Sequence, residues 1–159
     1  MVQPEALQEQ LENKVREIET AVTGISDERA SQARAQGEWC IKEILSHLTG
    51  SEQRTFYDGV KLFLAEDSPE IDTVPGDAYF GASRRDLSVD ELLEGVTRQY
   101  RDLGAWVGNL SAEQLSRKAH MPAFKETPLG EYPTLGLWVG AIINFHLTDH
   151  VQQLKTLCE

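Results

Sequence analysis

Apolar residues recur every three or four positions over four long stretches of this chain, and no long stretch alternates polar and apolar residues as a strand does. The first stretch runs from Pro4 to about Val22 and carries a single apolar stripe between charged residues. Spacing of this kind places the apolar side chains on one face of an α-helix. The pattern therefore predicts an all-α fold, a four-helix bundle in which the helices bury their stripes against one another.

The other three predicted helices cover residues 39–65, 88–110 and 134–157. Gly50 and Gly59 are weak points of the second helix, because glycine disfavours a helix interior. Ser88 with Glu91 three residues later forms a capping box before the third helix, and Thr134 is the expected cap of the fourth. These signals fix where the last two helices begin.

The connections between the helices are long and irregular. Ser26 and Ser111 each open a single predicted helical turn. Residues 66–87 have no sustained period and contain prolines and glycines, Pro75 among them, which predicts a crossing loop. Residues 116–133 are expected to form a small hairpin or an extended loop. Because all three connections are long, helices adjacent in sequence need not be neighbours in space.

Size and charge narrow the class of protein. A chain of 159 residues fits a single domain spanning residues 1–159. The formal net charge of -11 and the lack of any Lys/Arg run argue against nucleic acid and against an anionic membrane surface as partners. No signal peptide or membrane-spanning stretch is recognisable, so we expect a soluble cytoplasmic protein. Cys40 and Cys158 form no CxxC motif, which gives no support to a disulfide framework or a cysteine zinc site.

Three of the four histidines occupy helical positions that suit a shared metal ion. His146 and His150 are four residues apart, a spacing that puts their Cβ atoms about 5 to 6 Å apart on one helix face. His47 follows Trp39 at the same distance as His146 follows Trp138, and Leu-Thr comes after both histidines. The repeat indicates two related helices, each delivering a histidine from the same relative position. Three imidazoles with one open position form the ligand set of a catalytic metal site.

The choice of metal stays open between several ions. Neutral imidazoles bind borderline metals, so Zn, Ni or Fe(II) is expected, with Mn as a further option. The open position can hold a water of lowered pKa or a thiolate. The alternative is that the repeat records only packing in a quasi-symmetric bundle. Burying unpaired imidazoles is costly, whereas one metal ion satisfies all three, and this favours the metal site.

Five further residues are weaker candidates for roles near the metal. Asp149 and Gln153 can supply the outer hydrogen bonds that fix imidazole tautomers, or belong to an ordinary polar helix surface. Glu43 and Asp149 are the candidate catalytic acid or base residues, although a capping role fits Glu43 better. Cys40 fits a cap or a small buried residue better than a ligand or nucleophile. His120, in the irregular segment, is a weak candidate for a fourth ligand.

The segments around the three histidines also carry a family resemblance. Residues 37–53, GEWCIKEILSHLTGSEQ, and residues 144–154, NFHLTDHVQQL, resemble the two histidine segments of the DinB-like proteins, also called the DinB/YfiT-like superfamily. The likeness spans nearly the whole chain and implies metal-ligand roles for His47, His146 and His150. It also implies a four-helix bundle of unusual connectivity, often a homodimer, holding a divalent metal such as Ni or Zn.

Three functional hypotheses follow. The resemblance implies an activity like that of bacillithiol transferases and of a mycothiol-dependent maleylpyruvate isomerase, in which a metal activates a low-molecular-weight thiol. The leading hypothesis is therefore a metal-dependent enzyme, of thiol-transferase or hydrolase type, that activates a thiol or water against a small-molecule substrate. The second is a non-catalytic metal-binding dimeric module. The third is a helical interaction protein whose histidine cluster holds no metal.

Overall fold

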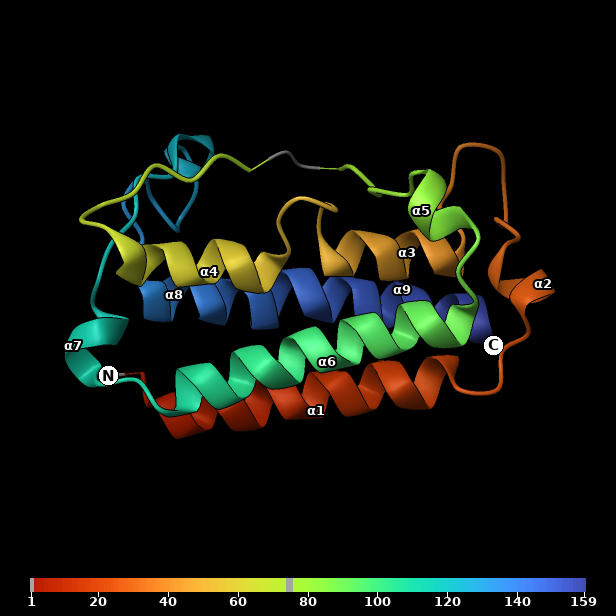
Figure 1. The fold of residues 1–159 in the computed structure, drawn as a ribbon, viewed down its shortest axis with the longest axis horizontal. Coiled ribbons are helices and arrows are strands. Elements are labelled where there is room, and N and C mark those ends of the chain that lie inside the picture. Colours follow the sequence, from red (N-terminus) through yellow and green to blue (C-terminus); the bar gives the residue numbers. More distant parts are fainter. Residues whose placement is uncertain (1, 74–75) are drawn as a thin grey trace.

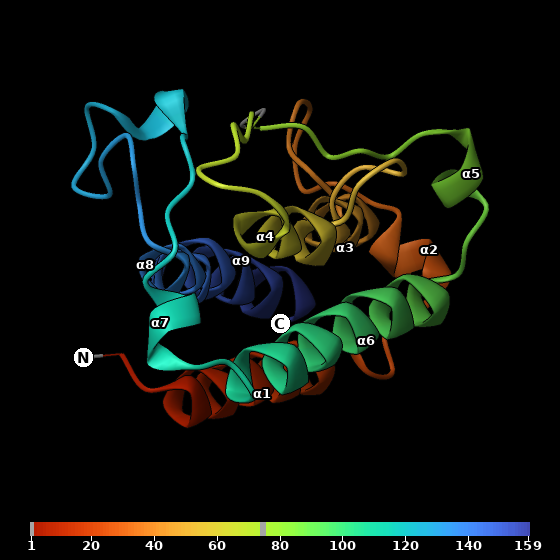
Figure 2. The same ribbon diagram turned by 60° about the vertical axis from the view of Figure 1, so that its left-hand side comes forward.

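Four long helical segments form a bundle (Figures 1 and 2) in the computed structural model, which describes residues 2–73 and 76–159. The long segments are α1 (Pro4–Val22), α3 (Ile41–Thr49) followed by α4 (Phe56–Ala65), α6 (Val89–Gly108), and α8 (Leu135–Ala141) continued by the π-helical segment η2 (Ile142–Leu147) and α9 (Thr148–Cys158). Short turns of helix lie in the connections: α2 (Asp27–Ala30), α5 (Ala82–Arg85), α7 (Ala112–Leu115) and the 3-10 turn η1 (Pro122–Phe124). The predicted all-α four-helix bundle is confirmed.

Helices that follow one another in the sequence are not the main packing partners. α1 packs chiefly against α6 and α9, and α3 packs against the same two helices. Figure 1 shows α1 and α9 running in one direction and α4 and α6 in the other. Since α4 ends at the opposite end of the bundle from the start of α6, the intervening chain crosses its whole length, as the predicted crossing loop requires. Pro75, on which that prediction partly rested, lies outside the described residues.

The core consists of the predicted apolar stripes. The α1 stripe is at most 3 % exposed, and it comprises Leu7, Leu11, Val15, Ile18 and Val22. In α6 the fully buried Tyr100 donates its hydroxyl hydrogen to the carbonyl oxygen of Leu48, 2.8 Å away. Gln99 of the same helix donates its side-chain amide to that carbonyl at 3.3 Å. These bonds satisfy a carbonyl at the end of α3, and they anchor the helical turn that carries His47.

The prediction of one continuous second helix over residues 39–65 is wrong in its middle part. α3 ends at Gly50, which has φ 93° and ψ -169°, and an antiparallel bridge joins Gly50 to Thr55. Thr55 then caps α4, with its hydroxyl accepting from the amide of Asp58 at 3.2 Å. Glycine reaches positive φ without a Cβ clash, so the predicted weak point became a break. Ser51, the sequence counterpart of His150, consequently lies outside any helix.

The fourth helical segment is continuous but not uniformly α-helical. Thr134 caps it as predicted, with its hydroxyl accepting from the amide of Leu137 at 3.2 Å. Residues Ile142–Leu147 form a π-helical segment, and the hydroxyl of Thr148 donates to the carbonyl of Ile143 at 2.8 Å. Such π segments are rare and often occur at functional sites. This one contains His146.

The segment before α8 folds back and pairs with itself. Of the two predicted alternatives, a small hairpin or an extended loop, the hairpin is therefore the one found. An antiparallel bridge joins Lys118 to Thr134, and the amide of Met121 donates to the carbonyl of Glu131 at 2.8 Å. The chain between these arms contains η1 and lies to one side of α8 (Figure 2).

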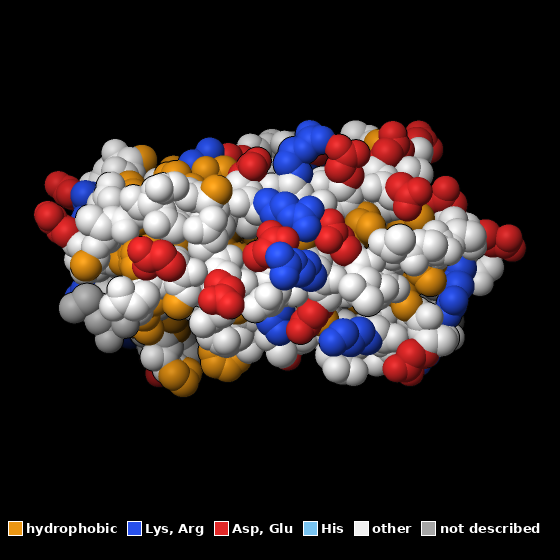
Figure 3. Space-filling model, turned by 90° about the horizontal axis from the view of Figure 1, so that it is seen from below, with side chains coloured by type: hydrophobic (Ala, Val, Ile, Leu, Met, Phe, Trp, Pro, Cys, Tyr) orange, Lys and Arg blue, Asp and Glu red, His pale blue; other side chains and the backbone are white. Residues whose placement is uncertain are grey.

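The surface of α1 and α6 is charged. Figure 3 shows Lys and Arg side chains interleaved with Asp and Glu side chains across the middle of this face. Arg101 of α6 reaches both Glu12 and Glu19 of α1, at 3.2 and 2.9 Å. Within the described chain, no helix has the length and apolar character needed to cross a membrane.

Candidate metal centre

The imidazole rings of His47, His146 and His150 form one cluster. Their ring centroids are 4.7 to 4.9 Å apart, and one ligand nitrogen from each ring lies within 4.8 Å of the other two. Nitrogens bound to one tetrahedral ion at about 2.1 Å are about 3.4 Å apart, so small side-chain shifts suffice to bind an ion. The last turn of α3 supplies the first ring, and the π segment and the first turn of α9 supply the others. The fold thus brings together the three predicted ligands.

The tautomer of His47 is fixed by a backbone carbonyl. Its Nδ1 atom lies 2.7 Å from the carbonyl oxygen of Asp77. A carbonyl oxygen only accepts hydrogen bonds, so Nδ1 carries the proton and the neutral ring presents the lone pair of Nε2. That atom lies 2.8 Å from Nε2 of His146, inside the cluster. His47 is therefore oriented with Nε2 available to coordinate an ion.

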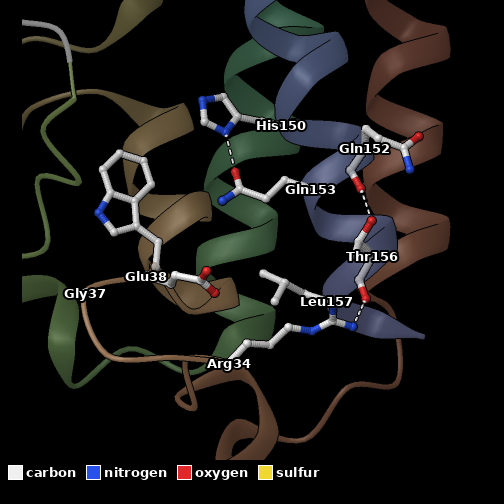
Figure 4. A pocket seen from close by; sticks show the side chains of 9 residues that line it. Arg34, Gly37, Glu38, His150, Gln152, Gln153, Thr156 and Leu157 are labelled. Atoms are coloured by element: carbon white, nitrogen blue, oxygen red, sulfur yellow. Dashed lines mark hydrogen bonds between the residues drawn. The ribbon is translucent and has the colours of Figure 1, made fainter.

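Gln153 orients the ring of His150 in the same way. The Nδ1 atom of His150 lies 2.9 Å from Oε1 of Gln153, which leaves Nε2 free to coordinate (Figure 4). Of the two candidate outer partners, Gln153 therefore makes the predicted bond. Asp149 makes no hydrogen bond to a ring within the described residues, and its charge only opposes the lowering of the His150 pKa.

His146 is the ring whose outer nitrogen is unsatisfied. Its Nδ1 atom is buried and has no hydrogen-bond partner among the described residues. Burial, followed by the nearby charges of His150 and His47, lowers the pKa of His146 to about 3. A buried imidazole nitrogen without a partner is an exception in folded proteins, and an ion in the cluster would not satisfy it, because the ring faces the cluster with Nε2. Three neutral imidazole nitrogens form the donor set, and no charged side chain belongs to it. Such a set fits a borderline divalent metal.

All three rings are neutral at physiological pH. Burial is the largest cause that lowers the pKa of His47, and the hydrogen bond that the ring donates to the carbonyl of Asp77 opposes it only in part. Burial likewise lowers the pKa of His150, against the hydrogen bond to Gln153. Neutral imidazole is the form that binds metal, so protons do not compete with an ion near pH 7.

Aromatic side chains enclose the cluster. Trp39 lies with its ring centroid 4.9 Å from that of His47, and it stacks on His150 at 6.3 Å. The ring centroid of Phe56, the first residue of α4, lies 5.0 Å from that of His146. Tyr79 stacks on His47 at 6.3 Å with the ring planes 4° apart. These rings limit water around the imidazoles and strengthen electrostatic interactions inside the site.

A second layer of contacts holds the segment that contains Asp77. The hydroxyl of Ser46 donates to the carbonyl of Tyr79 at 2.8 Å, and the amide of Tyr79 donates to Oδ1 of Asp77 at 2.8 Å. Arg84 donates to the carbonyls of Ser46 and Gly50 at the end of α3. Asp77 and Arg84 were not predicted from the sequence, because they lie in an irregular segment and a backbone acceptor leaves no signal in a sequence.

The comparison with protein families agrees with this arrangement. The model of the DinB superfamily matches residues 10–154. This chain belongs to the DinB superfamily. A curated relative from Oceanobacillus iheyensis, named "putative metal-dependent hydrolase", is 26% identical over 111 residues. The match covers 68% of this chain and 62% of the relative, so this chain spans less than two thirds of that protein.

A solved structure supports the fold of this DinB-superfamily chain. YfiT from Bacillus subtilis, described as "a probable metal-dependent hydrolase with an unusual four-helix bundle topology", superposes with a TM-score of 0.77. The alignment covers 97% of this chain and 85% of YfiT at 21% identity. At that identity the likeness establishes the shared four-helix topology.

The weaker candidates of the DinB-superfamily chain have other contacts. Glu43 accepts the backbone amide of Cys40 at 3.3 Å, which is a capping role. Cys40 is buried, and burial raises the pKa of its thiol, so it is not a thiolate. His120 lies outside the cluster, 3.0 Å from Glu131 and 3.3 Å from Glu70. The structure therefore gives His120 two carboxylate partners away from the three rings.

Two cavities meet at the candidate metal centre of this DinB-superfamily chain. The smaller, about 620 Å³, is lined by polar and charged side chains that include Arg34 and Glu38 (Figure 4). The larger, about 1120 Å³, contains all three histidines in its wall. Trp39 and His150 line both cavities. The three histidine rings can thus be reached by a small molecule.

Proposed function

We propose that this DinB-superfamily protein is a metal-dependent hydrolase of a small molecule, with His47, His146 and His150 as the metal ligands. The observation that carries the proposal is the convergence of three neutral imidazoles in the wall of a large cavity. The names given to the relatives from Oceanobacillus iheyensis and Bacillus subtilis support it. The substrate reaches the centre through the cavity.

The donor set indicates the kind of ion. Three imidazole nitrogens suit Zn, Ni or Fe(II), and Mn is a weaker fit because it prefers oxygen ligands. Three protein ligands leave a coordination position open, and an ion so held polarises a carbonyl group and activates water near neutral pH. Asp77 and Gln153 orient two of the rings, so little ordering is required when the ion binds.

Acid or base assistance has one remaining candidate among the predicted residues. Glu43 is engaged as a cap, whereas Asp149 is close enough to His150 to affect its pKa. We keep Asp149 as the candidate acid or base; both nitrogens of His150 are engaged, Nδ1 by Gln153 and Nε2 by the proposed ion, so Asp149 would act on the substrate or on water and not through that ring. Its replacement by Asn would lower turnover without removing the metal.

Thiol transfer is the second candidate activity, and the family resemblance supports it. A low-molecular-weight thiol can occupy the same open position as water, because thiolate binds the same borderline ions. Turnover of an electrophile only when a thiol is added would favour transfer, and turnover without thiol would favour hydrolysis.

Sedimentation analysis tests the homodimer that the resemblance implies.

The decisive experiment measures metal and activity on the same protein. Untagged protein should contain about one equivalent of Zn, Ni or Fe per chain, and it should hydrolyse p-nitrophenyl acetate. The variant His146→Ala should lose both, while the matched control His120→Ala, outside the cluster, should keep both. Metal without turnover, with or without thiol, would favour the non-catalytic module.

A fourth outcome would remove every metal hypothesis. Less than about a tenth of an equivalent of metal, together with an unchanged melting temperature when Zn or Ni is added, would leave only the helical interaction protein. An ion at a hundred times its Kd stabilises the folded state by about 2.7 kcal/mol, which is several degrees in Tm for a chain of this size.

A further inference from the structure

Exposed apolar side chains concentrate at one place on the protein. Four large hydrophobic side chains are exposed among the described residues, and three of them line the larger cavity: Phe145 at 69 %, Leu137 at 52 % and Val2 at 41 %. The fourth, Tyr132, stacks on His120 outside that cavity. Clustered exposed apolar surface marks a binding site, whereas single exposed residues do not.

This apolar groove, as we call the larger cavity, runs from the metal centre to the surface. Its wall includes the start of α1 with Val2, the segment with Phe124 and Leu129, and the α8–η2 face with Leu137 and Phe145. The three histidines and Phe56 form its inner part. A molecule with one group at the rings must therefore extend along apolar side chains.

The groove is also uncharged. No Asp, Glu, Lys or Arg is among the described residues that line it. The smaller cavity differs, because Arg34 and Glu38 lie at its wall and Arg34 donates to the carbonyl of Thr156 (Figure 4). Burying a charged group without a partner is costly, so the groove selects a ligand that is neutral along its length.

We propose that the apolar groove binds the acyl chain of an uncharged lipophilic ester or amide whose carbonyl group lies at the three-histidine centre. This inference rests on the proposed hydrolase function and names its substrate class. In the reaction the oxygen of one water bonds to the carbonyl carbon and the bond from that carbon to the leaving oxygen or nitrogen breaks. The leaving group takes one proton of the water, and the acid formed releases its own proton to solvent.

Continuity with the metal centre favours a small molecule over a second copy of the chain. His47 is only 7 % exposed, so a flat protein surface that covers Phe145 and Leu137 does not reach it, whereas a chain-like molecule does. The volume of about 1120 Å³ is close to the 300 to 1,000 Å³ typical of small-molecule pockets. The acid product is anionic, and a protein of net charge -11 disfavours its retention.

The test uses alkyl hydroxamates of increasing chain length and zinc-loaded protein. The hydroxamate group binds the metal, and the alkyl chain samples the groove. The Kd should fall about fourfold for each added methylene from acetohydroxamate to octanohydroxamate, because each buried methylene adds a roughly constant gain. A Kd that stays within twofold across the series would overturn the inference.

Variants locate the effect in the groove. Leu137→Ser and Phe145→Ser should weaken octanohydroxamate binding about tenfold or more and leave acetohydroxamate binding unchanged. Both side chains are exposed, so these changes spare the core. Tyr132→Ser, at a residue about as exposed as Leu137 but outside the groove, is the matched control and should leave both Kd values unchanged.

A second measurement separates this inference from the proposed function. Metal-free protein should bind the uncharged dye N-phenyl-1-naphthylamine, and Phe145→Ser but not Tyr132→Ser should weaken that binding. If acetohydroxamate does not bind while the dye still binds, the metal centre is rejected and the apolar binding site is retained. A dimer that Phe145→Ser dissociates, with no dye bound, would overturn the inference in favour of a second copy covering the groove.

Discussion

The Nδ1 atom of His47 donates to the carbonyl oxygen of Asp77, thirty residues further along the chain and 2.7 Å away. This bond fixes the ring so that Nε2 faces the other two histidines. It depends on a carboxylate, because Oδ1 of Asp77 accepts the amide of Tyr79 and thereby holds the turn that presents the carbonyl.

Removal of that carboxylate should weaken metal binding. Asp77→Ala frees the turn, and we expect the affinity for zinc to fall about tenfold or more, as is usual when an outer partner of a ligand is lost. Competition with a chromophoric chelator measures the change. Asp77→Asn keeps an oxygen acceptor and should bind nearly as tightly as the wild type; equal weakening by both substitutions would mean that charge, and not geometry, is what matters.

Gln153 should contribute in a similar way through His150. Its Oε1 atom is the acceptor for the Nδ1 proton of that ring, at 2.9 Å. Gln153→Ala is expected to lower zinc affinity about tenfold, with little effect on the melting temperature of the metal-free protein. Gln152→Ala, one position away and without a bond to a ring, should bind zinc normally. Identical affinities for the two variants would contradict the positioning role.

The metal-free protein should lose stability as the pH falls below about 6.5. The folded-state pKa of His146 is about 3, against 6.5 in the unfolded chain, so the unfolded state binds more protons between these values. Stability is therefore fully present above pH 6.5 and declines towards pH 3. For His146 the difference between pH 7 and pH 5 is up to about 2 kcal/mol, and His146→Ala should reduce the measured difference by that amount.

Urea denaturation at the two pH values, in the presence of EDTA, measures this effect. His120→Ala provides a control of opposite sign. The hydrogen bond to Glu131, followed by that to Glu70, raises the pKa of His120, so its contribution is present at low pH and is lost as the pH rises. Its removal should therefore increase the pH difference. A pH difference that His146→Ala leaves unchanged would argue against a buried neutral ring.

Periodicity and motif spacing were sufficient for most of the helices and for the clustering of three histidines, because both depend on local pattern. The α1 stripe and the caps at Ser88 and Thr134 are found where the sequence places them. The spacing of His146 and His150 placed both side chains on one face of one helix, and the Trp-His repeat identified His47 as the third histidine.

Contacts between distant segments had no such signal. The π segment around His146 has no local residue pattern that distinguishes it from an ordinary helix turn. The stacking of Trp39 on His150 joins segments far apart in the chain, and Asp77 acts through its backbone. The break between α3 and α4 occurs at Gly50, which the sequence marked only as a weak point of one continuous helix.

That break yields the last prediction, in which two glycines of one predicted helix respond in opposite ways. A Cβ at Gly50 would lie 3.0 Å from the amide nitrogen of Phe56, and φ is 93°, so Gly50→Ala should cost about 1 to 3 kcal/mol and weaken zinc binding by displacing His47 and Phe56. Gly59 is helical, and an added Cβ meets nothing within 4 Å. Gly59→Ala should therefore stabilise the protein by up to about 1 kcal/mol and leave zinc binding unchanged. Urea denaturation of both variants checks this, and a Gly50→Ala protein as stable as Gly59→Ala would mean that α3 and α4 join as one continuous helix.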